Sequence, residues 1–395
     1  MEKLKTAVRF GADAVYFGGE MFSLRAGAGN LSVPEIAEAM DWLHENGARG
    51  YMTVNIYPHN GDIWPLRDYI SKISDIPVDA FIVSDPGVIS IIREQIPDAE
   101  IHLSTQANTT NYVTAQFWAS MGVKRIVAAR EMSLEELSEM RRNLPDDVEI
   151  EAFVHGAMCI SYSGRCLLSN FMAGRDANQG ACTHPCRWKY ALVEEQRPGE
   201  YYPIEEDERG SYILNSRDLC MIDRIPDLAE AGVYSFKIEG RMKSMYYVAT
   251  VVTAYRAAID EYLKDPDNYV FNEAHFDELC KASHREFTHG FYFNKPTDKD
   301  QNYLTSEYTR DYSFVGLVRE TDEETGLTTV EQRNKFSVGD TVEVFGPYTP
   351  FYEETISEMY NEEGEPVESA PHPQQILKIR FRRKPEEGFI LRKRK

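Results

Sequence analysis

The sequence predicts an α/β protein with a TIM-like (β/α) barrel, followed by a small C-terminal all-β barrel domain. Apolar, strand-like segments alternate with amphipathic ones and recur every roughly 20 to 35 residues, which is typical of successive βα units. From residue 312 the pattern changes to short strand-like segments separated by turns. Polar residues follow the ends of the barrel segments, where such folds carry their chemistry.

Seven apolar segments are predicted to be barrel strands. They are residues 14–19, 50–57, 79–85, 100–106, 123–129, 148–154 and 234–240. A complete (β/α)8 barrel has one strand more, and this chain opens on a helix, "EKLKTAVRFG". We therefore expect a barrel that lacks its first strand, with a seven-stranded or open sheet as the alternative.

Helix signals support this organisation. Ser32 is a suitable N-cap for a helix over 33–47 that stops at Gly47, and Pro86 begins another helix. We predict a barrel over residues 1–265 with a cysteine-containing insertion at 155–220. The other predicted parts are a connector over 266–311 and the β domain over 312–395.

The formal net charge of −21 argues against general adhesion to nucleic acid or to an anionic membrane, although a local basic groove remains compatible with it. The basic tail "LKIRFRRKPEEGFILRKRK" is either a solvated edge strand with a basic end or a nucleic-acid contact. No apolar run reaches the roughly 18 residues that span a bilayer, and the N-terminus does not read as a signal peptide. We expect a cytoplasmic protein with no membrane partner.

The predicted strand ends carry polar residues that can form a pocket. Each of them alone is compatible with a role in a cap or turn, and their common placement favours a shared site. They are Arg25, Asn30, Asn55, His59, Asp85, Gln106, Asn108, Arg130, His155, Lys237, Glu239 and Arg241.

The cysteines give the sharpest signal, because a reducing cytoplasm disfavours structural disulfides. Cys280 lies in a predicted helix and is expected to be a buried apolar residue. The other five are Cys159, Cys166, Cys182, Cys186 and Cys220. Four thiolates can hold an Fe–S cluster or a structural zinc, and a single one beside His155 or His184 can be a nucleophile. The spacing C-x6-C and C-x3-C lacks the C-x2-C pair of zinc ribbons, which favours the cluster.

The segment "EAFVHGAMCISYSGRCLLSNF" resembles the signature of the U32 peptidase (collagenase-like) family. The resemblance continues through "GRDANQGACTHPCRWKY", "SRDLC" and "SFKIEGRMKS", and it covers nearly the whole chain. Members of the family usually begin with a strand before this first helix, so the resemblance implies a chain that starts late. The sequence has no HExxH or GxSxG motif and no recognisable Ser/His/Asp order, so it gives a protease little support.

Other branches of the family are oxygen-independent hydroxylases, and the resemblance implies such an activity here. The branch most similar to this sequence converts uridine 34 of tRNA to 5-hydroxyuridine with prephenate as co-substrate. Related branches hydroxylate a cytidine of 23S rRNA or a quinone precursor. The resemblance therefore implies tRNA as the partner, and a second U32 family protein is a further candidate because some members work as pairs.

The resemblance also implies a [4Fe–4S] cluster on Cys159, Cys166, Cys182 and Cys220, with Cys186 as an alternative ligand. Arg25, Lys237 and Arg241 would hold the carboxylates of prephenate. His155 and Glu239 are candidates for proton transfer, and Tyr162 or Trp188 for stacking on a flipped base. The predicted catalytic residues are His155, Lys237, Glu239 and Arg241, and the predicted substrate-binding residues are Arg25, Asn55, Gln106, Asn108 and Tyr162.

Two other classes of function compete with this hypothesis. A protease would cleave gelatin without prephenate and would be stopped by a cysteine or metal inhibitor. A binding or assembly factor with a structural cluster would hold RNA without turnover.

Overall fold

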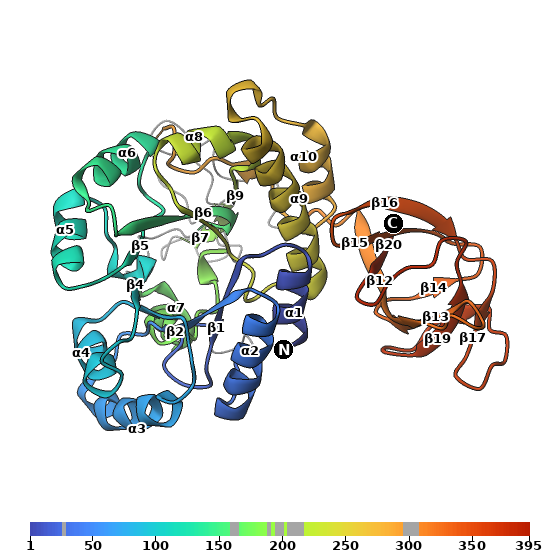
Figure 1. Cartoon of the computed structure of the whole chain (residues 1–395), viewed down its shortest axis with the longest axis horizontal. Helices are drawn as coiled ribbons and strands as arrows, with labels where there is room; N and C mark the ends of the chain where they lie inside the picture. Colours follow the sequence, from blue (N-terminus) through green and yellow to red (C-terminus); the bar gives the residue numbers. More distant parts are fainter. Residues whose placement is uncertain (26–28, 159–165, 188–190, 194–200, 204–216, 295–307) are drawn as a thin grey trace. The chain divides into compact units, whose positions relative to one another are not determined.

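The chain folds as two units, each assembled from segments that are distant in the sequence. The computed structural model describes residues 1–25, 29–158, 166–187, 191–193, 201–203, 217–294 and 308–395 (Figure 1). The first unit contains Asp13–Met242 and Arg285–Glu307. The second contains Glu2–Ala12, Lys243–His284 and Tyr308–Lys395. The residues before Asp13 and the segment Lys243–His284 therefore belong to the same unit as the C-terminal strands.

A nine-stranded sheet forms the centre of the first unit. Strands β1 to β6 follow one another in parallel, β10 runs parallel to β6, and β9 is antiparallel to β6 and parallel to β11. The strands are β1 (Ala14–Gly18), β2 (Arg49–Val54), β3 (Ala80–Val83), β4 (Ile101–Leu103), β5 (Arg125–Val127), β6 (Glu149–Ala157), β9 (Asp218–Cys220), β10 (Ser235–Ile238) and β11 (Phe287–Thr288).

All seven predicted strands are present and parallel, so the predicted α/β class is confirmed. Within the described residues, β1 pairs only with β2 and β10 only with β6, so hydrogen bonding does not close the sheet into a ring between β1 and β10. One side chain of β1 reaches across this opening, because Tyr16 Oη donates to the backbone carbonyl oxygen of Ile238 at 3.5 Å.

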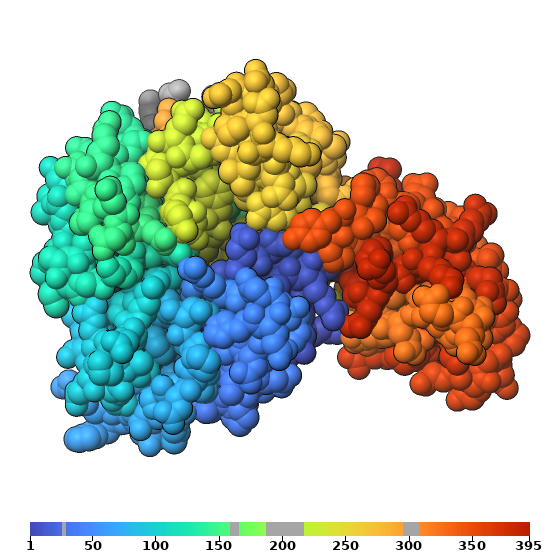
Figure 2. Space-filling model, in the orientation of Figure 1, coloured from blue at the N-terminus to red at the C-terminus, as the bar shows by residue number. Residues whose placement is uncertain are grey.

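Helices cover the outside of this sheet. They are α2 (Val33–Glu45), α3 (Ile63–Ile73), α4 (Pro86–Gln95), α5 (Tyr112–Ser120), α6 (Leu134–Asn143) and α8 (Ile225–Glu230). Figure 2 shows α2 to α6, coloured blue to green, as a continuous outer layer. The predicted cap of α2 is confirmed: the Glu35 carboxylate accepts hydrogen bonds from the Ser32 N–H at 2.8 Å and its hydroxyl at 2.7 Å.

The predicted insertion follows β6. Its described elements are α7 (Leu168–Ala173), the 3-10 turns η3 (Ala177–Gln179) and η4 (Pro185–Arg187), and the antiparallel pair β7 (Ala191–Val193) and β8 (Tyr201–Pro203). Strand β9 then returns the chain to the sheet beside the end of β6, where Cys220 pairs with His155.

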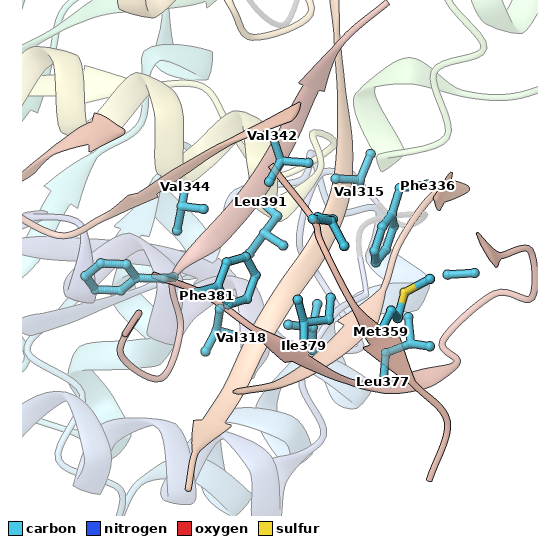
Figure 3. Packing of buried hydrophobic residues seen from close by; sticks show 14 residues of the cluster. Val315, Val318, Phe336, Val342, Val344, Met359, Leu377, Ile379, Phe381 and Leu391 are labelled. Carbon is cyan, nitrogen blue, oxygen red and sulfur yellow. The ribbon is translucent and has the colours of Figure 1, made fainter. Parts of the chain in front are cut away.

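The second unit combines α1 (Glu2–Arg9), α9 (Met245–Lys264) and α10 (Glu273–Cys280) with an antiparallel β domain. The main sheet has the order β16-β15-β20-β12-β13-β19-β17, and β14 pairs with β18. Buried Val, Ile, Leu, Met and Phe side chains form one core between the strands (Figure 3). The strands are β12 (Tyr312–Thr321), β13 (Leu327–Gln332), β14 (Phe336–Ser337), β15 (Thr341–Gly346), β16 (Thr349–Thr355), β17 (Met359–Tyr360), β18 (Ser369–Ala370), β19 (Ile376–Arg380) and β20 (Ile390–Arg394).

The interpretation of the C-terminal tail as a solvated edge strand is wrong. Strand β20 pairs with both β12 and β15 and is therefore central in its sheet. Arg392 is fully buried, and its guanidinium donates to Glu343 at 2.7 Å and to Glu278 of α10 at 2.7 Å. This arginine is part of the internal structure of the second unit, because buried charges persist only when paired and hydrogen-bonded.

Candidate functional site

A polar pocket lies at the carboxyl ends of the parallel strands, where α/β folds of this kind place their sites. It holds about 520 Å³ of space, part of it open to solvent. Six of the predicted site residues line it together: Arg25, Asn55, Gln106, Lys237, Glu239 and Arg241. They come from the ends of β1, β2, β4 and β10, so the topology of the sheet brings together side chains that are far apart in sequence.

The lining is strongly cationic. Arg25, Arg130, Lys237 and Arg241 face a single lining carboxylate, Glu239, in a chain whose net charge is −21. Burial raises the pKa of Glu239, but the nearby arginines and Lys237 outweigh it and hold this pKa below its usual range. Glu239 is therefore a carboxylate at neutral pH, suited to accept hydrogen bonds and to hold arginines in place.

Glu239 also points to a ligand. Its Oε2 lies 3.6 Å from Nη2 of Arg130, while its buried Oε1 has no hydrogen-bond partner among the described residues. Buried polar atoms in native proteins are usually satisfied, and one left open in a pocket is accounted for by a bound molecule or water. The remaining positive charge of the lining is suited to an anionic ligand.

The loop after β1 and strand β2 hold the guanidinium of Arg241. Nη2 of Arg241 donates to Asn30 Oδ1 in the loop at 2.8 Å, and Nη1 of Arg241 donates to Thr53 Oγ1 on β2 at 3.3 Å. A side chain at Gly18 would collide with this guanidinium and with Ser23. The glycine at the end of β1 thus provides the space in which Arg241 reaches the pocket.

The amides of Asn55 and Gln106 differ in their freedom to bind a ligand. Asn55 is buried, its Nδ2 donates to Ser104 Oγ at 3.2 Å, and its Oδ1 accepts from Leu24 N–H at 3.2 Å. This amide therefore joins the ends of β2 and β4 to the β1 loop. Gln106 is held through its backbone, where its carbonyl oxygen accepts from Tyr57 Oη and its N–H donates to Ser104 Oγ at 3.3 Å.

His155 and Asn108 do not line the pocket. His155 is buried on β6 beside the ring of Phe287, at 5.6 Å between centroids, and opposite Cys220 in the strand pairing. Asn108 adopts φ 56° after the turn Thr105–Ala107, where its backbone N–H donates to Thr105 O.

Gly156 controls the position of Glu239. It has φ +120°, and a Cβ at this position would lie 2.8 Å from Glu239 Cβ. We predict that Gly156→Ala displaces Glu239 and lowers the melting temperature, since this φ already costs an alanine roughly 1–2 kcal/mol. Gly47→Ala is the matched control, because Gly47 has φ +69° with nothing near its Cβ position. Equal melting temperatures for the two variants would contradict the prediction.

Two aromatic residues that are not among the predicted site residues complete the pocket. Tyr16 and Phe153 contribute ring faces: Lys237 Nζ lies 4.3 Å from the Tyr16 centroid, and Arg130 Cζ lies 3.9 Å from that of Phe153. Burial raises the pKa of Tyr16, so its phenol is neutral. Tyr16 occurs inside an apolar strand pattern, where nothing separates a pocket residue from a core residue. Arg130 is one of the predicted strand-end residues, and the structure adds that it faces Glu239.

Four of the described cysteines lie on β9 or in the insertion that follows β6. Cys220 is buried on β9, while Cys166, Cys182 and Cys186 are partly exposed in the insertion. Thr183 N–H donates to Ser169 Oγ at 3.0 Å, which ties the segment after Cys182 to the segment after Cys166. Cys182 Sγ accepts from the backbone N–H of His184 at 3.4 Å. Cys159, Tyr162 and Trp188 lie outside the described residues.

The insertion packs against the pocket loops. Asn178 O accepts from Tyr57 N–H at 3.4 Å, Gln179 donates to Tyr57 O, and Asn178 Nδ2 donates to Cys166 O at 3.4 Å. Gly180 lies so close to the β1 loop that a Cβ would be 3.0 Å from Ser23 O. The segment after Cys166 is therefore fixed beside the loop that carries Arg25.

The described residues alone do not form a metal centre. Within them, no three Cys, His, Asp or Glu side chains are grouped to hold a metal ion, and no disulfide joins the described cysteines. The donor chemistry nevertheless fits thiolate ligation, because a backbone N–H to sulfur bond such as that at Cys182 is of the kind that tunes Fe–S sites. Cys280, in contrast, lies in α10, where burial raises the pKa of its thiol to about 11.

Comparison with known proteins places the chain in a family. The profile of peptidase family U32 matches residues 1–302, and that of the U32 C-terminal domain matches residues 310–392. The chain belongs to peptidase family U32, as its motifs predict. No helix within the described ranges combines the length and apolarity needed to cross a membrane.

Its relatives include tRNA hydroxylation protein P1 of Bacillus subtilis (strain 168), which is 42% identical over 395 residues, covering 100% of this chain and 93% of that protein. The tRNA hydroxylation protein P of Escherichia coli (strain K12) is 38% identical over 412 residues, covering 94% and 89%. A solved C-terminal domain of a Geobacillus thermoleovorans U32 peptidase is 41% identical, covering 20% of this chain and 99% of that one, with a TM-score of 0.20.

Proposed function

We propose that this protein hydroxylates tRNA at C5 of uridine 34, without oxygen and with prephenate as the source of the hydroxyl group. One observation carries the proposal: a cationic strand-end pocket, bordered by a cysteine-bearing insertion, occurs in a chain similar over its whole length to a tRNA hydroxylation protein. The pocket would take prephenate, and tRNA would present its base at the open side.

The pocket charges suit this co-substrate. Prephenate carries two carboxylates, and guanidinium groups bind carboxylates through paired, charge-assisted hydrogen bonds. Arg25, Arg130 and Arg241 would hold these groups, and Lys237 would add a fourth cation at the base of the pocket. Glu239 would keep Arg130 in position and prevent the arginines from repelling one another.

Loss of hydroxide and CO2 from prephenate gives phenylpyruvate without net oxidation or reduction, whereas replacing the C5–H of uracil by C5–OH releases a proton and two electrons from the base. The reaction therefore needs an external two-electron acceptor, and a bound [4Fe–4S] cluster would pass these electrons to it one at a time. Cys159, Cys166, Cys182 and Cys220 are the proposed ligands, with Cys186 as the alternative. The ring face of Tyr162 or Trp188 would stack on the base.

Direct binding tests the pocket assignment. Arg130→Gln removes a guanidinium that stacks on Phe153 and faces Glu239. We expect it to weaken prephenate binding about tenfold or more, as for the loss of a hydrogen bond between charged groups. Isothermal calorimetry with prephenate, and with the monocarboxylate phenylpyruvate as control, measures this effect. Equal affinity of the wild type for both compounds would contradict recognition of a dicarboxylate.

A cellular assay tests the activity. The chain is expressed in a bacterial strain that lacks hydroxylation of wobble uridine, and its tRNA nucleosides are analysed by mass spectrometry. The proposal predicts that 5-hydroxyuridine returns, and that it does not return in cells that cannot make prephenate. Full restoration in prephenate-free cells would refute this co-substrate.

A further inference from the structure

A buried carboxylate lies directly beneath the pocket. Glu151 is on β6, is 3% exposed and does not line the pocket, whereas Lys237 on β10 is 8% exposed and does line it. Glu151 Oε1 lies 2.5 Å from Lys237 Nζ. Strands β6 and β10 pair side by side over this stretch, so the backbone register holds the two side chains together.

Both carboxylate oxygens of Glu151 already have partners within the protein. Oε1 accepts from Lys237, while Oε2 accepts from Ser235 Oγ at 2.8 Å and lies 3.3 Å from Arg125 Nη1. Burial raises the pKa of Glu151, but Lys237 and Arg125 outweigh burial and bring it to about 2. Glu151 is thus a fixed anion within the parallel sheet, and the proposed function gives it no part.

We propose that Glu151 is a positioning residue that fixes Lys237 as a cation at the base of the pocket; this inference rests on the proposed binding of prephenate. A lysine has a flexible four-carbon stem, and its ammonium has three donors. Glu151 takes one donor, and the rings of Tyr16 and Phe153 lie 4.3 and 5.8 Å from Nζ. The ammonium is thereby held to one place, with donors left for a carboxylate of the ligand.

Removing the anchor would also change the charge of the pocket. The Lys237 charge already contributes to the low pKa of Glu239, so the two groups interact electrostatically. Without Glu151, Lys237 would be drawn toward Glu239, the carboxylate that lines the same pocket. Pairing with Glu239 would offset the charge of that carboxylate and withdraw one cation from the ligand. The affinity for the ligand would fall, and the orientation of the ligand would change.

The experiment compares Glu151→Gln with Glu149→Gln. Glu149 lies two residues away on β6 and pairs with Arg125 at 2.6 Å in the same charge network, whereas Lys237 pairs with Glu151. We expect Glu151→Gln to weaken prephenate binding about tenfold and Glu149→Gln less than about twofold, since only the first loses a charged hydrogen bond to Lys237. Glu151→Asp, which keeps the charge, should recover part of the affinity. Equal losses in the two glutamine variants would overturn the positioning role.

A second readout separates this inference from the proposed function. The same four proteins, wild type included, are treated with an amine-acetylating reagent, and labelling of Lys237 is followed by peptide mass spectrometry. The anchor predicts slow labelling in the wild type and Glu149→Gln, and labelling at least about fivefold faster in Glu151→Gln, because a buried, paired ammonium is a poor nucleophile. Equal rates overturn the anchor even if prephenate binds. A wild type that binds no prephenate but shows this rate pattern refutes the proposed co-substrate alone.

Discussion

Arg392→Ala is expected to lower the free energy of unfolding of the second unit by about 3–5 kcal/mol, as typically follows when one partner of a buried ion pair is removed. Arg392 has no exposed surface and joins β20 to Glu343 of β15 and Glu278 of α10. The substitution leaves two mostly buried carboxylates beside each other. Lys281, which lies 2.8 Å from Glu343 and 3.3 Å from Glu278, compensates for part of the loss.

Arg380→Ala is the matched control for this prediction. Arg380 pairs with Glu358 at 2.6 Å on the surface of the same sheet, where 51% of its side chain is exposed. A surface pair of this kind contributes about 0–1 kcal/mol. Urea denaturation followed by circular dichroism measures both variants, and similar midpoints would show that the buried network does not stabilise the unit. Arg392→Met, which keeps the contact with Phe345, should be less damaging than alanine.

Cys220→Ala is expected to abolish iron binding and with it hydroxylation. The proposed cluster needs four thiolates, and Cys220 is held by β9 at the end of β6. Iron and acid-labile sulfide are measured on protein purified without oxygen. The wild type should contain about four irons per chain, as for a [4Fe–4S] centre, and Cys220→Ala less than about one.

Cys280→Ala provides the control for iron content. Cys280 lies in α10 of the second unit, and its raised pKa of about 11 disfavours the thiolate form that binds metal. This variant should retain the full iron content. Cys186→Ala tests the alternative ligand. Loss of iron from this variant would show that Cys186 is a ligand in place of one of the four proposed cysteines. Stoichiometric zinc in the wild type would contradict the cluster, and iron that survives in Cys220→Ala would contradict Cys220 as one of its ligands.

Much of the first unit is predictable from sequence because its strands are buried on both faces. Apolar runs identify all seven parallel strands, and the strand-end rule alone predicts seven of the residues that line the pocket. Strands β9 and β11, with three and two residues, are not among the predicted strands. Their positions depend on the end of β6, which no local pattern encodes.

The partners of individual side chains are harder to predict from the sequence than the positions of the strands. Arg392 looks like part of a basic tail, and only the fold reveals that Glu278, 114 residues away, neutralises it. Glu151 alternates with apolar residues in β6 and gives no sign that it faces Lys237 across the β6–β10 pairing. Both buried charges depend on long-range pairing, which a pattern of hydrophobic and polar residues does not contain.

The origin of the hydroxyl oxygen tests the central claim most directly. Protein purified and assayed without oxygen is given unmodified tRNA, a soluble electron acceptor, and prephenate labelled with ¹⁸O in its ring hydroxyl group, and the nucleosides are analysed by mass spectrometry. The proposed function predicts 5-hydroxyuridine that carries the heavy isotope and is absent when prephenate is omitted. Unlabelled 5-hydroxyuridine, or no hydroxylated nucleoside from a protein that instead cleaves gelatin, would contradict it.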